Sequence, residues 1–208
     1  MKKFLIFTVL FAILSFSTSL FAKDVGPYIG IGGSYAYEDF DIDDEDLEEV
    51  GIDVDFDNTQ GINLKAGYHF NKLFSLEFNF DFLPSFEWDD STTYLGVPIN
   101  VDAEGDITTY MLVGKISPDF GSEIIRPFVV AGFGIMHGEI DVTASVFGYP
   151  IVLVSDSETD TCAKIGIGVD FFSKENVSIG LEGNYVWGFG DMDEFRYMNY
   201  TLGVAYHF

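Results

Sequence analysis

The sequence predicts an all-β fold, an eight-stranded antiparallel up-and-down transmembrane β-barrel. The main observation is that apolar residues alternate with small or polar ones in eight segments of about 9 to 11 residues, the length of tilted membrane strands. A second observation is an export signal over residues 1–22. A third is that residues 23–208 contain no apolar stretch of the roughly 20 residues that a membrane helix needs. If this chain spans a bilayer, it must therefore close into a barrel.

The amino-terminal segment has the parts of a cleaved secretory signal. Two lysines precede an apolar run over residues 4–14, and Ala22 stands before the expected cleavage site. We therefore expect residues 1–22 to be a signal peptide and residues 23–208 to form one barrel domain. Cys162 is the only cysteine, so an intramolecular disulfide is impossible.

The charge balance is strongly acidic. The chain carries 34 acidic and 10 basic residues, which gives a formal net charge of −24 at pH 7. Binding to nucleic-acid phosphates depends on Lys and Arg. We therefore expect no nucleic-acid partner.

Among the first three expected strands, the second and third show the alternation most clearly, and the first has one gap at Gly33. They span residues 27–38, 59–70 and 73–82. Their apolar faces are formed by Ile29, Ile31, Tyr35, Tyr37, Ile62, Leu64, Ala66, Tyr68, Phe70, Phe74, Leu76, Phe78, Phe80 and Phe82. The opposite faces carry glycine, other small residues, and polar or charged residues, as expected for a strand between lipid and a lumen.

The fourth expected strand, residues 106–116, is the least decided. Residues 108, 110 and 112 compete with residues 109, 111, 113 and 115 for the lipid-facing side. We place Lys115 inside, because a charge on the lipid face is costly.

The last four expected strands span residues 124–136, 160–171, 177–187 and 197–208. Their apolar faces are formed by Val129, Ala131, Phe133, Ile135, Ala163, Ile165, Ile167, Val169, Phe171, Ile179, Leu181, Tyr185, Trp187, Tyr200, Leu202, Val204, Tyr206 and Phe208. The final strand ends on an aromatic residue, as membrane strands that stop at an interface often do.

Connections alternate between short and long, as in outer-membrane barrels. The short connections are residues 71–72, 117–123 and 172–176. The long ones, expected to be loops, are residues 39–58, 83–105, 137–159 and 188–196. An even strand count then places both termini on the periplasmic side and the long loops outside the cell.

The alternation alone leaves open a soluble, lipocalin-like barrel that buries its apolar face. Size decides between the two, because the interior of an eight-stranded barrel is only just wide enough for side chains. Most of the Phe and Tyr residues lie on the apolar faces and would not fit inside. The glycine-rich faces relieve crowding in a narrow lumen, so we expect glycine inside and aromatic residues toward lipid, in belts at both interfaces.

The predicted lumen face contains four basic and four acidic residues. They are Lys65, Lys115, Arg126 and Lys164, with Glu77, Asp81, Asp170 and Glu182. In the second hairpin Lys65 would lie opposite Asn79, and we expect its diagonal neighbours Glu77 and Asp81 to hold it as ion partners. Buried charges must be paired, so we expect a static polar network that fills the lumen. The alternative is a gate for small ions.

The most acidic segment is residues 38–57. Residues 53–59 imitate the start of an EF-hand loop, but Asn58 replaces its glycine and Leu64 stands where glutamate is required. We therefore expect a solvated loop, with no metal site and no cofactor. Loose association with Ca²⁺ or Mg²⁺ is the alternative.

Catalytic residues are not expected. His137 lies near Glu139 and Asp141, but no motif connects it to Ser145 or Ser155 as a nucleophile. A serine nucleophile needs a base within hydrogen-bonding reach and a third group that orients the base. We predict that the protein is not an enzyme.

Several segments together resemble a known family, the small eight-stranded outer-membrane barrels of the OmpA transmembrane-domain and opacity-protein type. The segments are residues 26–33, 65–70, 76–78, 126–132 and 166–172. The end of the chain resembles the signal read by the outer-membrane assembly machinery. The residues concerned are Tyr200, Leu202, Val204, Tyr206 and Phe208.

This resemblance implies a protein of the bacterial cell outer membrane with a structural or cell-surface role and a closed lumen. A narrow porin-like channel for ions or small solutes is the alternative, and adhesion through the external loops is a third possibility. The expected partners are outer-membrane lipids, lipopolysaccharide and the assembly machinery. We expect a monomer.

Overall fold

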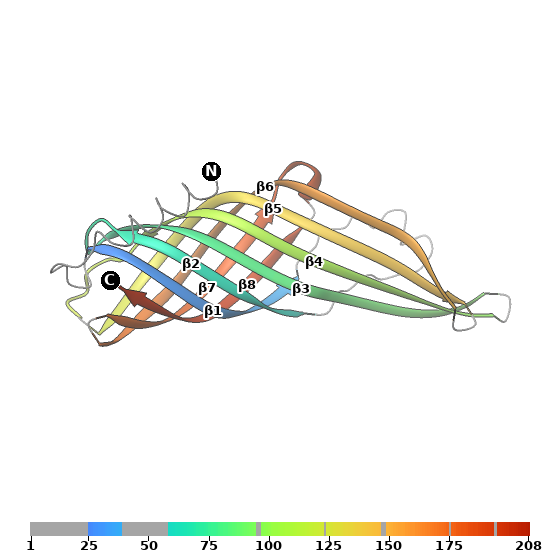
Figure 1. Ribbon diagram of the computed structural model, residues 1–208, viewed down its shortest axis with the longest axis horizontal. Coiled ribbons are helices and arrows are strands. Elements are labelled where there is room, and N and C mark those ends of the chain that lie inside the picture. The colour runs from blue at the N-terminus through green and yellow to red at the C-terminus, as the bar shows by residue number, and fades with distance from the viewer. Residues whose placement is uncertain are drawn as a thin grey trace, which may run out of the picture.

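The computed structural model describes residues 25–38, 58–94, 97–122, 124–146, 149–174, 176–193 and 195–208. Eight antiparallel strands in this part of the chain form a closed barrel in which each strand pairs with the next and β8 pairs with β1 (Figure 1). The strands are β1 (Gly26–Glu38), β2 (Thr59–His69), β3 (Phe74–Tyr94), β4 (Val97–Ile116), β5 (Ile125–Val146), β6 (Tyr149–Lys174), β7 (Val177–Gly188) and β8 (Arg196–His207). The predicted fold class is confirmed. The expected signal peptide and the acidic segment 39–57 lie outside the described residues.

Inside the membrane, the two faces of the strands are those predicted. Apolar side chains point outward on every strand, for example Ile31 at 63% exposure and Leu202 at 61%. The undecided strand β4 presents Tyr110 and Leu112 outward, whereas Met111 and Lys115 are buried. The lipid-facing side is therefore apolar all the way round the barrel.

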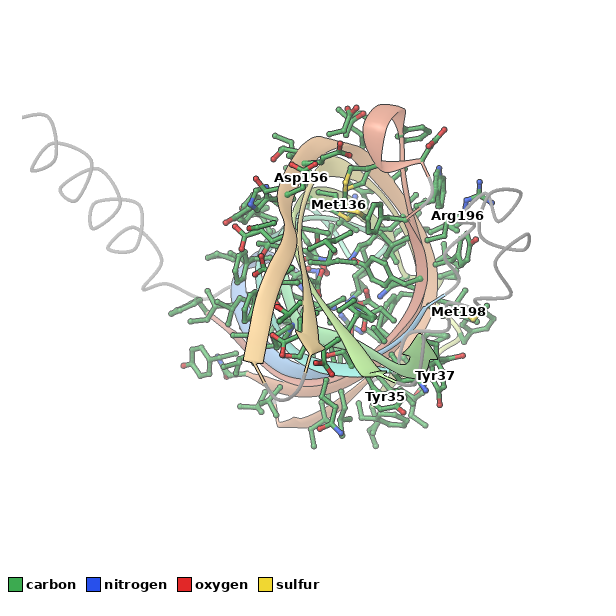
Figure 2. All side chains as sticks on the ribbon, turned by 90° about the vertical axis from the view of Figure 1, so that its right-hand side faces the viewer. Tyr35, Tyr37, Met136, Asp156, Arg196 and Met198 are labelled. Carbon is green, nitrogen blue, oxygen red and sulfur yellow. The ribbon has the colours of Figure 1, made fainter. Side chains whose placement is uncertain are left out.

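Aromatic rings group near both ends of this apolar face. At one end the ring of Tyr37 contacts those of Tyr35 and Tyr200, at centroid distances of 4.9 and 5.9 Å. At the other end Phe70 stacks on Phe74 at 5.7 Å. Figure 2 shows Tyr35 and Tyr37 pointing away from the ring of strands. Such belts are typical of the two membrane interfaces.

Two of the expected long loops are wrong. Residues 83–94, 97–105, 137–146 and 149–159 continue the strands, so that β3 pairs with β4 up to Tyr94 and Val97, and β5 pairs with β6 up to Val146 and Tyr149. The pairing of β2 with β3 ends at Phe82, and that of β6 with β7 ends at Cys162. Beyond these points β3 to β6 form a four-stranded sheet that projects from the barrel, at the right of Figure 1. We call this sheet the extension.

The sequence did not predict the extension, because the apolar residues change from the outward to the inward face of the strands outside the membrane. Within β4, Ala103 and Ile107 are buried on the inward face, whereas Asp102 and Glu104 point outward and are exposed. An outward face that meets water must be polar, and one that meets lipid must be apolar. The period of two continues while the apolar face changes sides.

At the other end of the barrel the connections are short, as expected. In the turn after β2, the side-chain oxygen of Asn71 accepts hydrogen bonds from the backbone N–H groups of Leu73 and Phe74, both at 2.8 Å. We call this end, where β1 begins and β8 ends, the terminal end. The β7–β8 connection contains a short 3₁₀ helix, η1 (Gly190–Met192). Within the described residues, no helix is both long enough and apolar enough to cross a membrane.

Candidate functional site: the lumen of the barrel

Two groups of charged side chains occupy the middle of the lumen. In the first, Lys115 Nζ lies 2.6 Å from Asp170 Oδ2 and 3.6 Å from Glu77 Oε1. In the second, Lys65 donates to Glu182 Oε2, and Lys164 Nζ lies 3.7 Å from Glu182 Oε1.

We call Glu77, Lys115 and Asp170 the acidic triad, and Lys65, Glu182 and Lys164 the basic triad. One lysine stands between two carboxylates in the acidic triad, and one carboxylate stands between two lysines in the basic triad. Their formal charges of −1 and +1 cancel. This balance lets the barrel bury both groups without a net charge.

The partner predicted for Lys65 is wrong. The register has Lys65 opposite Asn79, as expected, so that Glu77 and Asp81 are its diagonal neighbours in the same hairpin. Its ion pair nevertheless forms with Glu182 on β7, which is not a neighbour of β2 in the barrel. In so narrow a lumen, long side chains meet across the interior, and the neighbour rule for one hairpin does not include those contacts.

The other two predicted lumen residues lie outside the two triads. Asp81 accepts a hydrogen bond from Asn63 Nδ2 at 2.7 Å and a longer one from Thr109 Oγ1 at 3.4 Å. The guanidinium carbon of Arg126 lies 4.8 Å from the centroid of the Phe172 ring. The structure therefore brings six of the eight predicted residues into two ion clusters.

The acidic triad is also tied to a stack of aromatic rings at the terminal end. The hydroxyl group of Tyr28 donates to Glu77. The Tyr28 ring stacks on His69 and His207, at centroid distances of 4.4 and 5.2 Å, and Phe172 lies 5.1 Å from His207. These rings fill the lumen between the triads and the terminal end. The sequence did not predict this stack.

Buried apolar side chains fill the lumen at the extension end, which the sequence did not predict. They include Leu83, Phe86, Ile107, Met111, Met136 and Met192. Met192 comes from η1, which belongs to a segment predicted to be an external loop. Its side chain instead packs against Gly138, which has no side chain to block it. The β7–β8 connection therefore helps to fill this end of the lumen.

A small cavity lies between the two triads. It has a volume of about 40 Å³ and is lined by residues that include Tyr28, Lys65, Glu77, Asp170 and Glu182. A cavity needs roughly 10 to 15 Å³ of volume to hold one water molecule. This cavity can therefore hold ordered water, but it is too small to be an open pore.

His137 has two polar contacts on the exposed side of the extension. Its Nδ1 atom lies 2.6 Å from Thr159 Oγ1, and its Nε2 atom lies 3.2 Å from Glu139 Oε1. The Glu139 side chain is 61% exposed, whereas a hydrolytic triad orients its histidine with a buried carboxylate. In the described part of the chain, no group of three or more His, Cys, Asp or Glu side chains is placed to hold a metal ion.

A closed barrel with an apolar outer face, aromatic rings near both ends of that face and a charged interior defines an integral membrane protein of the outer-membrane β-barrel class. The chain belongs to the outer membrane protein beta-barrel domain family, whose model matches residues 8–208. It is thus a protein of the bacterial outer membrane. The comparison with curated proteins found no matching sequence.

Solved structures of outer-membrane barrels resemble this fold at low sequence identity. Ail, the attachment invasion locus protein of Yersinia pestis, was crystallised with the heparin analogue sucrose octasulfate and is 20% identical. Its TM-score is 0.55, with 89% of this chain and 99% of that chain covered. OprG of Pseudomonas aeruginosa is 14% identical, with a TM-score of 0.51 over 89% of this chain and 97% of that chain. Neisserial surface protein A is 13% identical, with a TM-score of 0.53 over 88% and 97%.

Proposed function

We propose that this protein is a structural and cell-surface barrel of the outer membrane whose lumen does not conduct ions. The observation that carries the proposal is the filled interior, in which two buried ion triads leave a cavity of about 40 Å³. The ring stack at the terminal end and the apolar side chains at the extension end support it. Ions that cross a barrel as hydrated species need a continuous water path. The narrow channel is therefore the weaker candidate.

We further propose the orientation, oligomeric state and assembly signal of the barrel. Both termini lie in the periplasm, because the strand number is even and short connections lie at their end. The barrel works as a monomer among outer-membrane lipids and lipopolysaccharide. The outward side chains at the end of β8 act as the assembly signal, and no residue acts in catalysis.

Conductance in planar bilayers tests the closed lumen. We expect the refolded wild-type protein to show little or no conductance at moderate voltages, because charged and apolar side chains fill the lumen. Asp102→Asn, an exposed substitution in the extension, should leave the trace unchanged. Large and stable openings of the wild-type protein would overturn the structural role and favour the channel.

A second candidate function is surface binding, and the extension is the observation that favours it. The extension projects beyond the apolar face, and its exposed residues include Asp102, Glu104, Glu139, Asp141, Asp156 and Glu158. A surface of one charge attracts partners of the opposite charge and speeds their association. The partner class that fits is a cationic polymer or protein. The proposed binding surface is therefore the extension, which is a sheet, and not the external loops that the sequence suggested.

Cysteine labelling on intact cells tests both the orientation and the binding surface. In a Cys162→Ala background, Ser157→Cys in the extension should react with a membrane-impermeant maleimide, and Lys72→Cys at the terminal end should not. Polylysine should slow labelling at Ser157→Cys if the extension binds cations, and polyglutamate should not. Labelling of Lys72→Cys alone would reverse the orientation. Equal labelling rates of Ser157→Cys with polylysine and with polyglutamate would contradict the binding role.

A further inference from the structure

Sulfur-containing side chains gather in the lumen at the extension end. The chain contains five methionines and one cysteine. Apart from Met1, which lies outside the described residues, and Met198 on the lipid face, all of them belong to one buried cluster with at most 1% exposure. Figure 2 shows Met136 inside the ring of strands and Met198 outside it. We call Met111, Met136, Cys162 and Met192 the sulfur cluster.

Three strands bring the first members of the cluster together. Met111 on β4 and Cys162 on β6 are both register partners of Gly134 on β5. A Cβ atom at Gly134 would lie 2.9 Å from Met111 Cγ, so the glycine makes room for the thioether chain. Met136 follows two residues later on the same inward face. The three side chains thus start from adjoining positions on one wall.

Met192 reaches the cluster from η1. A Cβ atom at Gly138 would lie 2.9 Å from Met192 Cε and 3.6 Å from its Sδ, so this sulfur lies directly over the glycine next to Met136 on the inward face. The turn is held by the Phe189 N–H, which donates to the Thr161 carbonyl oxygen at 2.9 Å. The fourth sulfur is therefore placed by backbone contacts and not only by apolar packing.

The chemistry of these four groups selects one class of ligand. Thioethers and thiolates are soft donors that prefer Cu(I), whereas Ca²⁺ and Mg²⁺ prefer oxygen ligands. Three neutral thioethers and one thiolate carry a single negative charge, which balances a monovalent ion. A divalent ion would leave one positive charge that the four sulfur groups do not balance. Methionine also serves as a flexible filler of cores, and a filler role predicts no ligand at all.

We propose that the sulfur cluster binds one soft monovalent ion of the Cu(I) class and so forms a metal site at the extension end of the lumen. On binding, the Sγ–H bond of Cys162 breaks, an Sγ–metal bond forms, and the proton leaves to solvent. No oxidant or reductant takes part. The proposal is independent of whether the lumen conducts ions.

Silver(I) is the probe, because it has the same charge and similar softness and is not oxidised in air. The protein is refolded in detergent micelles in a chloride-free buffer and titrated calorimetrically with silver nitrate. We expect one Ag⁺ per chain and the release of about one proton, measured by repeating the titration in buffers of different ionisation enthalpy. Calcium and magnesium nitrates should give no binding.

Leucine variants separate a metal site from an apolar filler. Leucine nearly conserves the volume of methionine, and such exchanges are among the best tolerated in a buried core, so these barrels should still fold. Met136→Leu and Met192→Leu should each weaken Ag⁺ binding at least tenfold. The matched control Met198→Leu, on the lipid face, should change it less than twofold. Folding is checked by circular dichroism and by heat-dependent migration in gels.

The outcomes are decisive in either direction. Unchanged affinity in folded Met136→Leu or Met192→Leu protein would overturn the site and leave silver bound to Cys162 alone. Since η1 is not part of the barrel wall, Met192→Leu decides the question if Met136→Leu does not fold. Cys162→Ala should abolish proton release, and persistence of that release would show that the thiol is not a ligand.

Discussion

Replacing Glu182 with Gln is expected to lower the free energy of unfolding by about 3 to 5 kcal/mol, the cost of leaving a buried ion partner uncompensated. Glu182 is 3% exposed and is the only carboxylate of the basic triad. Glutamine has nearly the same shape, so the loss comes from charge and not from packing. Urea unfolding of the protein refolded in lipid vesicles measures it.

A double substitution tests the cause of this loss. Lys65→Gln combined with Glu182→Gln should recover part of the stability, because one uncompensated cation is then removed. Glu139→Gln is the matched control, since the Glu139 side chain is 61% exposed and its contact with His137 contributes at most about 1 kcal/mol. Strictly additive losses would show that Lys65 and Glu182 do not interact.

Replacing Phe78 with Arg should destabilise the barrel by about 2 to 4 kcal/mol, as for a cation on the lipid face near the bilayer midplane. Phe78 is 50% exposed on the outward face of β3, and its register partners Ala66 and Leu112 are apolar residues on the same face. The arginine would therefore point into hydrocarbon. The same urea unfolding assay measures the change.

The control for Phe78→Arg is the same substitution at a position outside the bilayer midplane. Phe120 is also exposed but lies in the β4–β5 connection at the terminal end, where an arginine costs about 0 to 1 kcal/mol. Phe120→Arg should therefore be nearly silent. Equal losses for Phe78→Arg and Phe120→Arg would place Phe78 outside the membrane.

The position of Lys65 depends on local constraints, whereas its ion partner depends on distant ones. Its position on the inward face follows from the period of two, and its position opposite Asn79 follows from the short turn after β2. Its ion partner on β7 follows from neither, because nothing in one hairpin specifies which side chain faces it across the lumen. For the same reason, the sequence did not predict the ring stack of Tyr28, His69 and His207.

The sequence by itself determined the closed barrel, the number of strands and their lipid-facing sides, because each strand position meets either lipid or lumen and its chemistry records which. Only the tertiary structure decided that β3 to β6 continue as the extension, because water outside the membrane reverses which face must be polar. It also decided the two triads and the burial of Met192. The Lys65–Glu182 and Lys115–Asp170 contacts cross the lumen, so they form only when the barrel closes around a narrow interior.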